Sequence, residues 1–369
     1  MSQFSAIDYQ MMSRAIELAK RGRFTTAPNP NVGCVITLNN EVVGEGYHKK
    51  AGEPHAEVHA LRMAAERAKG ATAYVTLEPC SHYGRTPPCA EGLIKAGVSK
   101  VICAMSDPNP QVAGRGFNML REAGIEVSVG LLEQDARALN PGFLKKMETG
   151  MPFVQLKMAA SLDGQTALAN GKSQWITGPE ARRDVQAYRA QSGAILSTSQ
   201  TVVEDNASLN VRWDELPSHV TDVIKPDELR QPTRVILDRQ NALSRELKLF
   251  QSEGDMIRVA QAGGDLNVTM NSANQLDLAE TLQGLAKDQQ INHVWIEAGA
   301  TLAGSMIQQQ LVDELIVYLA PKLMGADGRG LIGALGLTEM QDVIELDIKD
   351  IRMVGSDIRI VATPQLKQK

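Results

Sequence analysis

Aromatic residues are scarce in this sequence. Phe, Trp and Tyr make up 4% of the 369 residues, so the hydrophobic cores must be built from Leu, Ile, Val, Met and Ala. Hydrophobic residues still amount to 43% of the chain and charged residues to 22%, as in an ordinary globular protein. The length predicts two domains of about 150–220 residues, each with enough apolar material for a core of its own.

Long apolar runs and clusters of basic residues are also missing. No segment approaches the ~18 consecutive apolar residues of a membrane span, and residues 1–9 lack the basic-then-apolar pattern of a signal peptide. We therefore expect a cytoplasmic protein without membrane contact. The net charge of −5 argues against a nucleic-acid partner, whereas a few placed arginines would still bind an anionic small molecule. The composition is compatible with a homo-oligomer.

Cysteine is used sparingly and unevenly. The four cysteines, Cys34, Cys80, Cys89 and Cys103, all lie in the first third of the chain. In a cytoplasmic protein such residues are ligands or core residues more often than disulfides. Cys34 and Cys103 lie within apolar segments, so we expect them in the core. Cys80 and Cys89 remain available for chemistry.

Helix and strand patterns alternate in both halves of the chain, which predicts two α/β domains. In the first half the expected helices are 8–21, 54–69, 90–96 and 116–123, and the expected strands are 32–38, 41–47, 73–77, 98–105 and 125–129. In the second half the expected strands are 153–159, 193–197, 234–237, 256–260, 293–297, 315–319 and 358–363, and the expected helices are 179–191, 279–287 and 301–310. The Gly- and Pro-punctuated segment 141–152 is interpreted as the boundary, which gives domains 1–149 and 150–369.

The most informative motif is His55-Ala56-Glu57, followed by Pro79-Cys80 and then Cys89. One imidazole and two thiolates can bind Zn²⁺ and leave a fourth position for water, whose pKa the metal brings near neutrality. Glu57 is not needed as a ligand and can transfer protons. This order of residues is the signature of the zinc deaminases, in which the Glu is the general acid and base.

The same motif is compatible with other kinds of site. A closed structural zinc site would need a fourth ligand, for which His48, His59 and His82 are the candidates. His59 does not complete a metalloprotease helix, because the order here is H-x-E-x-H and not H-E-x-x-H. A base-editing enzyme acting on tRNA or DNA would share the motif but would carry a basic surface. A zinc-stabilised binding protein would not need Glu57.

Residues 81–88, which separate Cys80 from Cys89, extend the short P-C-x-x-C spacing of many base deaminases. The segment from Pro79 to Cys89, together with Ala27–Gly33 and His55–Glu57, resembles the bifunctional deaminase/reductase family of riboflavin biosynthesis. The resemblance continues in the second half of the chain. It includes Lys157, Ser161-Leu162-Asp163-Gly164, Ser173-Gln174-Trp175-Ile176-Thr177 and Glu297-Ala298-Gly299. These retained motifs argue against a monofunctional deaminase with a decayed second domain.

For the first domain, the resemblance implies a cytidine-deaminase-like three-layer α/β/α fold and hydrolysis of the exocyclic amine of a phosphoribosylamino pyrimidine. It implies that His55, Cys80 and Cys89 bind one zinc ion and that Glu57 is catalytic. Asn29 would contact the substrate ring, for which its amide offers a donor and an acceptor. His82 and Arg85 either face the substrate phosphate or belong to a solvated loop.

The second domain has no G-x-G-x-x-G motif, and its two Gly-rich places, at Gly299 and within residues 325–336, are weak signals alone. The resemblance implies a dihydrofolate-reductase-like α/β fold that uses NADPH to reduce the ribosyl group to ribityl. The implied cofactor-binding residues are Ala159, Trp175, Thr201, Asp205 and Gly299. The implied substrate-binding residues are Ser173, Arg189, Leu209, Arg212 and Glu297. The guanidinium groups of Arg189 and Arg212 can form paired hydrogen bonds with a phosphate. Asp163 precedes a glycine and is compatible with a turn. Asp205 could transfer a proton.

Overall fold

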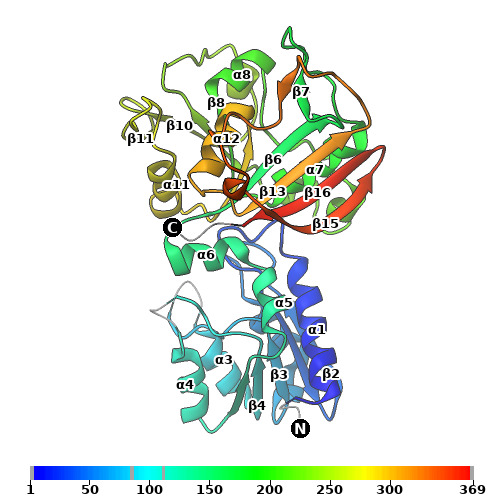
Figure 1. Cartoon of the computed structure of the whole chain (residues 1–369). Coiled ribbons are helices and arrows are strands. Elements are labelled where there is room, and N and C mark those ends of the chain that lie inside the picture. The colour runs from blue at the N-terminus through cyan, green and yellow to red at the C-terminus, as the bar shows by residue number, and fades with distance from the viewer. Residues whose placement is uncertain (1–3, 84–86, 110–112, 366–369) are drawn as a thin grey trace. The chain divides into compact units, whose positions relative to one another are not determined.

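The computed structural model describes residues 4–83, 87–109 and 113–365 (Figure 1). The chain divides into two compact units, Met1–Gly150 and Met151–Lys369. Each unit contains a sheet of mixed parallel and antiparallel strands and has its own hydrophobic core residues, in one cluster in the first unit and in two clusters in the second. Within the described residues, no helix is both long enough and apolar enough to cross a bilayer.

The first unit is built on a five-stranded sheet of order β2-β1-β3-β4-β5. Its helices and strands are α1 (Ala6–Lys20), β1 (Gly33–Leu38), β2 (Glu41–Tyr47), α2 (Ala56–Ala64), β3 (Thr72–Val75), α3 (Cys89–Ala96), β4 (Lys100–Cys103), α4 (Arg115–Glu122), β5 (Glu126–Val129), α5 (Glu133–Ala138) and α6 (Pro141–Thr149). Strand β1 pairs antiparallel with β2 and β3, and β3, β4 and β5 are parallel. Each helix and strand predicted in this half is present, with its ends shifted by a few residues.

Helices α1 and α2 lie on opposite faces of this sheet, and glycines set how closely they approach. A Cβ atom on Gly33 would lie 1.9 Å from the Ala15 carbonyl oxygen of α1. On β2, a Cβ atom on Gly44 would lie 2.2 Å from the Ala60 carbonyl oxygen of α2. Such separations are impossible, so only glycine permits this packing. The result is the three-layer α/β/α arrangement expected from the resemblance.

The segment interpreted as a boundary is a helix over most of its length. Pro141 occupies the first turn of α6, where its missing N–H leaves no hydrogen bond unmade, and Gly150 ends the helix with φ of 75°. The Gly and Pro residues that looked like breaks are therefore the two ends of one helix. Sequence reasoning also missed α5 just before it.

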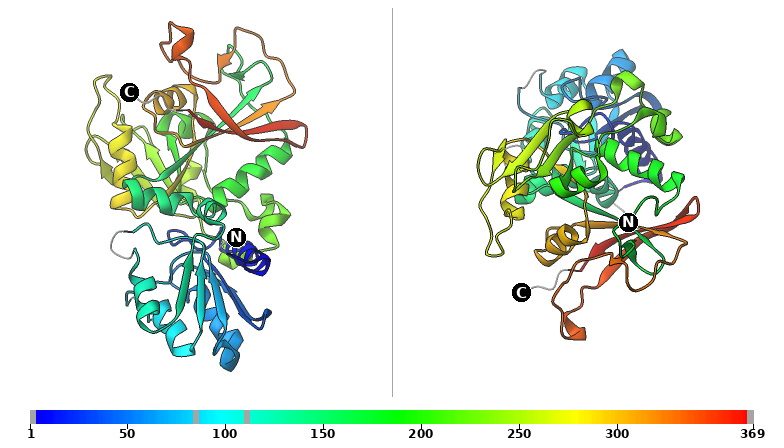
Figure 2. Two further views of the ribbon diagram at one scale, coloured as in Figure 1. Left: turned by 60° about the horizontal axis from the view of Figure 1, so that its bottom comes forward. Right: turned by 90° about the horizontal axis from the view of Figure 1, so that it is seen from above.

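The second unit contains a nine-stranded sheet of order β11-β10-β9-β8-β12-β6-β13-β16-β15. Figure 2 shows the ribbon of this unit, coloured from green to red, in two further views. Its strands are β6 (Phe153–Ser161), β7 (Gln165–Ala167), β8 (Ala194–Thr198), β9 (Thr233–Leu237), β10 (Met256–Ala260), β11 (Leu266–Asn267), β12 (His293–Glu297), β13 (Glu314–Ala320), β14 (Arg329–Gly330), β15 (Leu346–Val354) and β16 (Asp357–Pro364). Its helices include α7 (Pro179–Gln191), α8 (Ser199–Asp205), α11 (Leu278–Lys287) and α12 (Ala300–Gln308).

The central strands of this sheet are parallel and buried on both faces. Alternate residues point into two different cores. Leu196 and Ile296 face the core that contains α11 and α12, whereas Ile195 and Trp295 face the core that contains α7. In open parallel sheets, ligands bind outside the carboxyl ends of the strands where the strand order reverses. Here β12 is inserted between β6 and β8, so the carboxyl ends of these three strands are where a site is expected.

Sequence reasoning missed the edge strand β15, which pairs antiparallel with β16 and forms the red hairpin of Figure 1. Its sequence, Leu346-Asp-Ile-Lys-Asp-Ile-Arg-Met-Val354, has charges at uneven spacing, and the register shifts between Ile348 and Asp350. Charges and bulges on an edge strand prevent pairing with other chains, but they also hide the alternation that identifies a strand.

The contact pattern supports a proposal that residues 1–150 fold and bind zinc on their own. All three expected metal ligands and a complete hydrophobic core lie within this unit. We expect a fragment of residues 1–150 to unfold cooperatively and to contain about one zinc per chain. Metal analysis and thermal unfolding would test this, with the full chain as control. A fragment that stays insoluble while the full chain is well behaved would contradict the proposal.

Candidate active sites

The three expected zinc ligands lie together in the first unit. His55 precedes the first turn of α2, Cys89 is the first residue of α3, and Cys80 lies in the loop between β3 and α3. The His55 Nδ1 atom is 3.6 Å from the Cys80 Sγ atom and 3.3 Å from the Cys89 Sγ atom. Among the described residues, this is the one group of three or more His, Cys, Asp or Glu ligand atoms close enough to share a metal ion.

This triangle fits zinc. With Zn–S of about 2.3 Å and Zn–N of about 2.0 Å, tetrahedral coordination places nitrogen and sulfur about 3.5 Å apart. The two observed N–S distances are close to that value. A hydrogen bond with Cys89, followed by one with His55, lowers the pKa of the Cys80 thiol to about 4 although burial opposes the shift. Lowering the pKa favours the thiolate, which is the form that binds a metal.

Glu57 lies in the first turn of α2 and is 3% exposed. Burial raises the pKa of its carboxyl group, and the nearby Cys80 adds to the shift. Its Oε2 atom has no hydrogen-bond partner among the described residues. A buried carboxyl oxygen without a partner is costly and is characteristic of sites that exchange protons with a ligand.

Asn29 lies beside the zinc triangle through His48. The Asn29 Nδ2 atom is 3.3 Å from the His48 Nε2 atom, and the other His48 ring nitrogen lies 3.2 Å from the Pro54 carbonyl oxygen. The His48 and His55 rings meet edge to face at 5.4 Å. His48 was considered only as a fourth ligand, but its place between Asn29 and His55 makes it part of the site wall. In the sequence, the only indication that His48 belongs to the site is that it is a histidine.

None of the three candidate fourth ligands joins the triangle. His48 bonds elsewhere, His59 has a buried Nε2 atom without a partner among the described residues, and His82 is exposed. The arrangement therefore supplies three protein ligands. Arg85, the other candidate of the insertion, lies outside the described residues.

The buried carboxylate of Glu78, two residues before Cys80, was not anticipated. It is 4% exposed and accepts hydrogen bonds from several backbone N–H groups. The donors are Asp107 (3.2 Å), Gly114 (3.0 Å), Gly116 (3.0 Å) and Phe117 (3.4 Å). Glu78 thus ties the start of α4 and the residues after β4 to the segment that carries Cys80.

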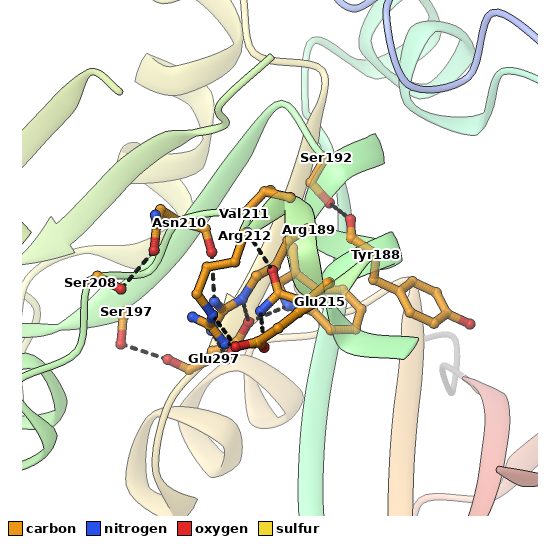
Figure 3. Close-up of polar contacts among 12 residues, drawn as sticks. Tyr188, Arg189, Ser192, Ser197, Ser208, Asn210, Val211, Arg212, Glu215 and Glu297 are labelled. Carbon is orange, nitrogen blue, oxygen red and sulfur yellow. Dashed lines mark hydrogen bonds and ion pairs between the residues drawn. The ribbon is translucent and has the colours of Figure 1, made fainter. Parts of the chain in front are cut away.

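In the second unit, Arg189 and Glu297 form a buried ion pair (Figure 3). The Arg189 Nε and Nη2 atoms donate to the two carboxylate oxygens of Glu297 at 2.6 and 2.9 Å, and Nη1 donates to the Asn210 carbonyl oxygen at 2.9 Å. Trp295 Nε1 donates to the same carboxylate at 2.8 Å. Burial opposes ionisation of Glu297, but the charge and hydrogen bond of Arg189, together with Lys157 and Trp295, outweigh it and lower the pKa to about 2.

Lys157 adds a third charge to this pair. It lies on β6 directly beside Glu297 on β12, and burial, followed by the positive charge of Arg189, lowers the pKa of its ammonium group. The sequence indicated Lys157 only through the family resemblance. Its position in an apolar strand was the available signal, because a charged residue in a buried strand needs a partner.

Arg212 forms a second, more exposed ion pair. Its Nε and Nη2 atoms each donate to a carboxylate oxygen of Glu215 at 2.6 Å. The two side chains are 43% and 41% exposed. Both arginines expected to bind substrate therefore hold a carboxylate in the structure, but only the Arg189 pair is enclosed.

Four of the five expected cofactor-binding residues lie at or just after the carboxyl ends of parallel strands. Ala159 is near the end of β6, Thr201 and Asp205 are on α8 after β8, and Gly299 is the residue before α12. The Ser197 hydroxyl donates to the Glu297 carbonyl oxygen at 2.6 Å and joins the ends of β8 and β12. Gly299 has open space beside its α-carbon, and no side chain caps α12, so the first-turn N–H groups can face a ligand.

The Ser173–Trp175 segment is held at the same edge. Trp175 is 66% exposed, and the Lys322 ammonium group donates to its carbonyl oxygen at 2.8 Å. The Gln174 side chain donates to Asp205 at 3.4 Å. The Arg182 guanidinium lies 4.7 Å from the Trp175 ring centre. Ser173 lies next to these contacts in the chain.

Leu209 and Asp163 differ in which part of the residue is used. The Leu209 side chain is 3% exposed in the core beside α7, with φ of 51°, so only its backbone is available to a ligand. Asp163 does more than make a turn. Its carboxylate accepts hydrogen bonds from the backbone N–H groups of Met324 and Gly325, at 2.9 and 2.8 Å for the closest oxygen, and so joins the loops after β6 and β13.

Comparisons with known proteins agree with both units. Residues 5–105 match the model of the cytidine and deoxycytidylate deaminase zinc-binding region. Residues 152–360 match the model of the RibD C-terminal domain. The riboflavin biosynthesis protein RibD of Escherichia coli is 55% identical over 95% of this chain and 98% of that protein. The Haemophilus influenzae RibD is 54% identical over 99% of this chain and 100% of that protein.

Solved structures give the same result. Acinetobacter baumannii RibD has 48% identity and a TM-score of 0.91, covering 98% of this chain and 99% of that chain. A Thermotoga maritima protein described as a diaminohydroxyphosphoribosylaminopyrimidine deaminase/5-amino-6-(5-phosphoribosylamino)uracil reductase has 31% identity and a TM-score of 0.84, covering 97% and 99%.

The fold and the two sites therefore define a bifunctional enzyme, a zinc-dependent deaminase joined to an NADPH-dependent reductase. The chain belongs to the RibD family of riboflavin biosynthesis proteins. This confirms the family resemblance and the fold class predicted from the sequence.

Proposed function

We propose that the first unit hydrolyses the exocyclic amine of a phosphoribosylamino-diaminopyrimidine and that the second unit reduces the ribosyl group of the deaminated product to ribityl. The observation that carries the proposal is the His55, Cys80 and Cys89 triangle beside the buried Glu57 carboxylate, in a chain whose second unit holds the enclosed Arg189–Glu297 ion pair at the carboxyl end of β12. The two reactions named for the Thermotoga maritima protein are these two activities.

In the deaminase site, His55, Cys80 and Cys89 would hold the zinc ion, which supplies a Lewis acid that activates water. Glu57 accepts a proton from the attacking water and returns one to the amine nitrogen as ammonia leaves. Burial of Glu57 keeps bulk water from competing for that proton. Asn29 orients the pyrimidine by offering a donor and an acceptor to the ring edge, and its contact with His48 fixes the amide.

In the reductase site, NADPH supplies a hydride to the opened sugar. We assign cofactor binding to Ala159, Trp175, Thr201, Asp205 and Gly299. Four of them lie at or just after the carboxyl ends of β6, β8 and β12, and Gln174, the neighbour of Trp175, donates to Asp205. We assign substrate binding to Ser173, Arg189, Leu209, Arg212 and Glu297. Within this set, Arg189 fixes the Glu297 carboxylate, and Arg212 is the guanidinium accessible enough to bind the substrate phosphate.

A small phosphorylated pyrimidine, and not a nucleic acid, is the proposed partner of both sites. The net charge of −5 supports this choice, because binding along a nucleic acid needs a broad basic surface.

Mass spectrometry of the reaction products tests the proposal. The purified chain is incubated with the diaminopyrimidine phosphate, with and without NADPH. We expect replacement of the amine by oxygen in both samples and a further gain of two hydrogens only with NADPH. Unchanged substrate in a zinc-loaded sample, or reduction that does not require a reduced nicotinamide, would contradict the proposal.

A further inference from the structure

The Arg212–Glu215 pair has the geometry of a phosphate complex. Two parallel N–H···O bonds of 2.6 Å join the guanidinium fork to the two oxygens of one carboxylate (Figure 3). Arginine binds phosphate oxygens with the same fork. Glu215 therefore occupies the donors that an incoming phosphate would need.

The Glu215 carboxylate is weakly held by other groups. Besides Arg212, its hydrogen-bond donor among the described residues is the Gln186 side chain, at 3.4 Å. The side chain is 41% exposed and stands in the last position of the short 3₁₀ turn Trp213–Glu215. An ion pair with this exposure is worth little and can exchange for another anion.

The Arg189–Glu297 pair is a contrasting case within the same unit. Its side chains are 11% and 14% exposed, and Trp295 and the Asn210 carbonyl oxygen hold both partners. Opening this pair would leave a charge buried without a partner, which is strongly unfavourable. Of the two pairs, only the one with Glu215 can open at low cost.

The charges around Glu215 favour its replacement by a stronger anion. The hydrogen bond from Arg212 lowers the pKa of Glu215 most, and the charges of Arg189 and Arg182 lower it further. Three guanidinium groups thus act on one carboxylate. A phosphate dianion in its place would carry more negative charge into the same field.

We propose that Glu215 is a competing carboxylate that occupies the phosphate-binding fork of Arg212 in the free enzyme and is displaced by the phosphate of the substrate. Glu215 acts through Arg212 and lowers the affinity of the reductase site for every phosphorylated ligand, while ligands without phosphate are unaffected. This inference rests on the proposed function, in which Arg212 binds the substrate phosphate.

The test is the full-length Glu215→Gln variant. It should lower the reductase KM for the phosphorylated substrate, and the inhibition constant of inorganic phosphate, by about 2- to 5-fold, which is the range expected for an exposed ion pair. The reductase kcat, the KM for NADPH and the KM for the dephosphorylated substrate should stay unchanged. A merely structural residue would not produce this split between KM and kcat.

Asp214→Asn is the matched control, because it removes one negative charge from an exposed residue of the same turn. It should leave both constants unchanged. In an Arg212→Ala background, Glu215→Gln should no longer lower KM, because the fork is gone.

The outcomes separate this inference from the proposed function. A raised KM or a lower kcat in Glu215→Gln would overturn it, since Glu215 would then assist binding or position Arg212 productively. An equal gain in Asp214→Asn would overturn it in favour of a general charge effect. If Arg212→Ala itself leaves KM unchanged, the phosphate assignment fails and the inference fails with it. If Arg212→Ala weakens binding but Glu215→Gln does not tighten it, only the inference fails.

Discussion

The Glu57→Gln variant is expected to retain about one zinc per chain and to lose deaminase activity by at least ~100-fold. The amide has nearly the shape of the carboxylate, so the His55, Cys80 and Cys89 triangle should persist. It cannot accept a proton from water or return one to the amine. Metal analysis and steady-state deamination kinetics on the same preparation check both parts.

The reductase half-reaction is the internal control for this variant, because its expected residues all belong to the other unit. Normal reduction of the deaminated substrate would show that the chain is folded. Loss of zinc from Glu57→Gln would mean that Glu57 holds the metal or its ligands, and the proton-transfer assignment would be wrong.

The Arg212→Ala variant is expected to lower reductase kcat/KM by about 10- to 150-fold. A charge-assisted hydrogen-bond contact contributes about 1.5–3 kcal/mol, and about 1.4 kcal/mol corresponds to a factor of ten. Displacing Glu215 offsets part of this contribution, so the lower half of the range is favoured. Deamination and NADPH binding should be nearly unchanged. Kinetics of each half-reaction, with a titration of the cofactor, measure all three quantities.

Arg183→Ala is a suitable control, because Arg183 is an exposed arginine on α7 of the same unit. It should leave the reductase unchanged. Equal loss of both activities in Arg212→Ala would indicate misfolding. Loss of NADPH affinity alone would mean that Arg212 binds the phosphate of the cofactor.

The deaminase site was accessible from the sequence because its geometry is local. His55 directly precedes the helix whose first turn carries Glu57, and Cys89 begins the helix that follows the loop containing Cys80. Motif spacing therefore specified which ligands would meet. The hairpin of β1 and β2 was equally local, since the adjacent residues Asn39 and Asn40 both adopt positive φ, as a tight hairpin turn requires.

The contacts within the proposed reductase site could not be predicted from motif spacing. The Arg189–Glu297 pair joins α7 to the end of β12, and Lys157 meets it from β6. These contacts depend on β12 being inserted between β6 and β8, which is a choice of strand order that no residue spacing encodes. The resemblance named most of these residues, but it did not indicate that Arg189 would be enclosed and Arg212 exposed.

The glycines of β2 have a consequence for how the metal site tolerates change. A Cβ atom on Gly46 would lie 2.7 Å from the Ala56 carbonyl oxygen, in the first turn of the helix that follows His55 and carries Glu57. The distance between β2 and α2 therefore helps to set where the His55 imidazole lies relative to the two thiols, although β2 supplies no ligand. A larger residue at Gly46 is excluded because its side chain would overlap the backbone of α2, and not because glycine takes part in the chemistry. Substitutions that change the packing of β2 against α2 would therefore alter the geometry of the metal site without changing any of its ligands.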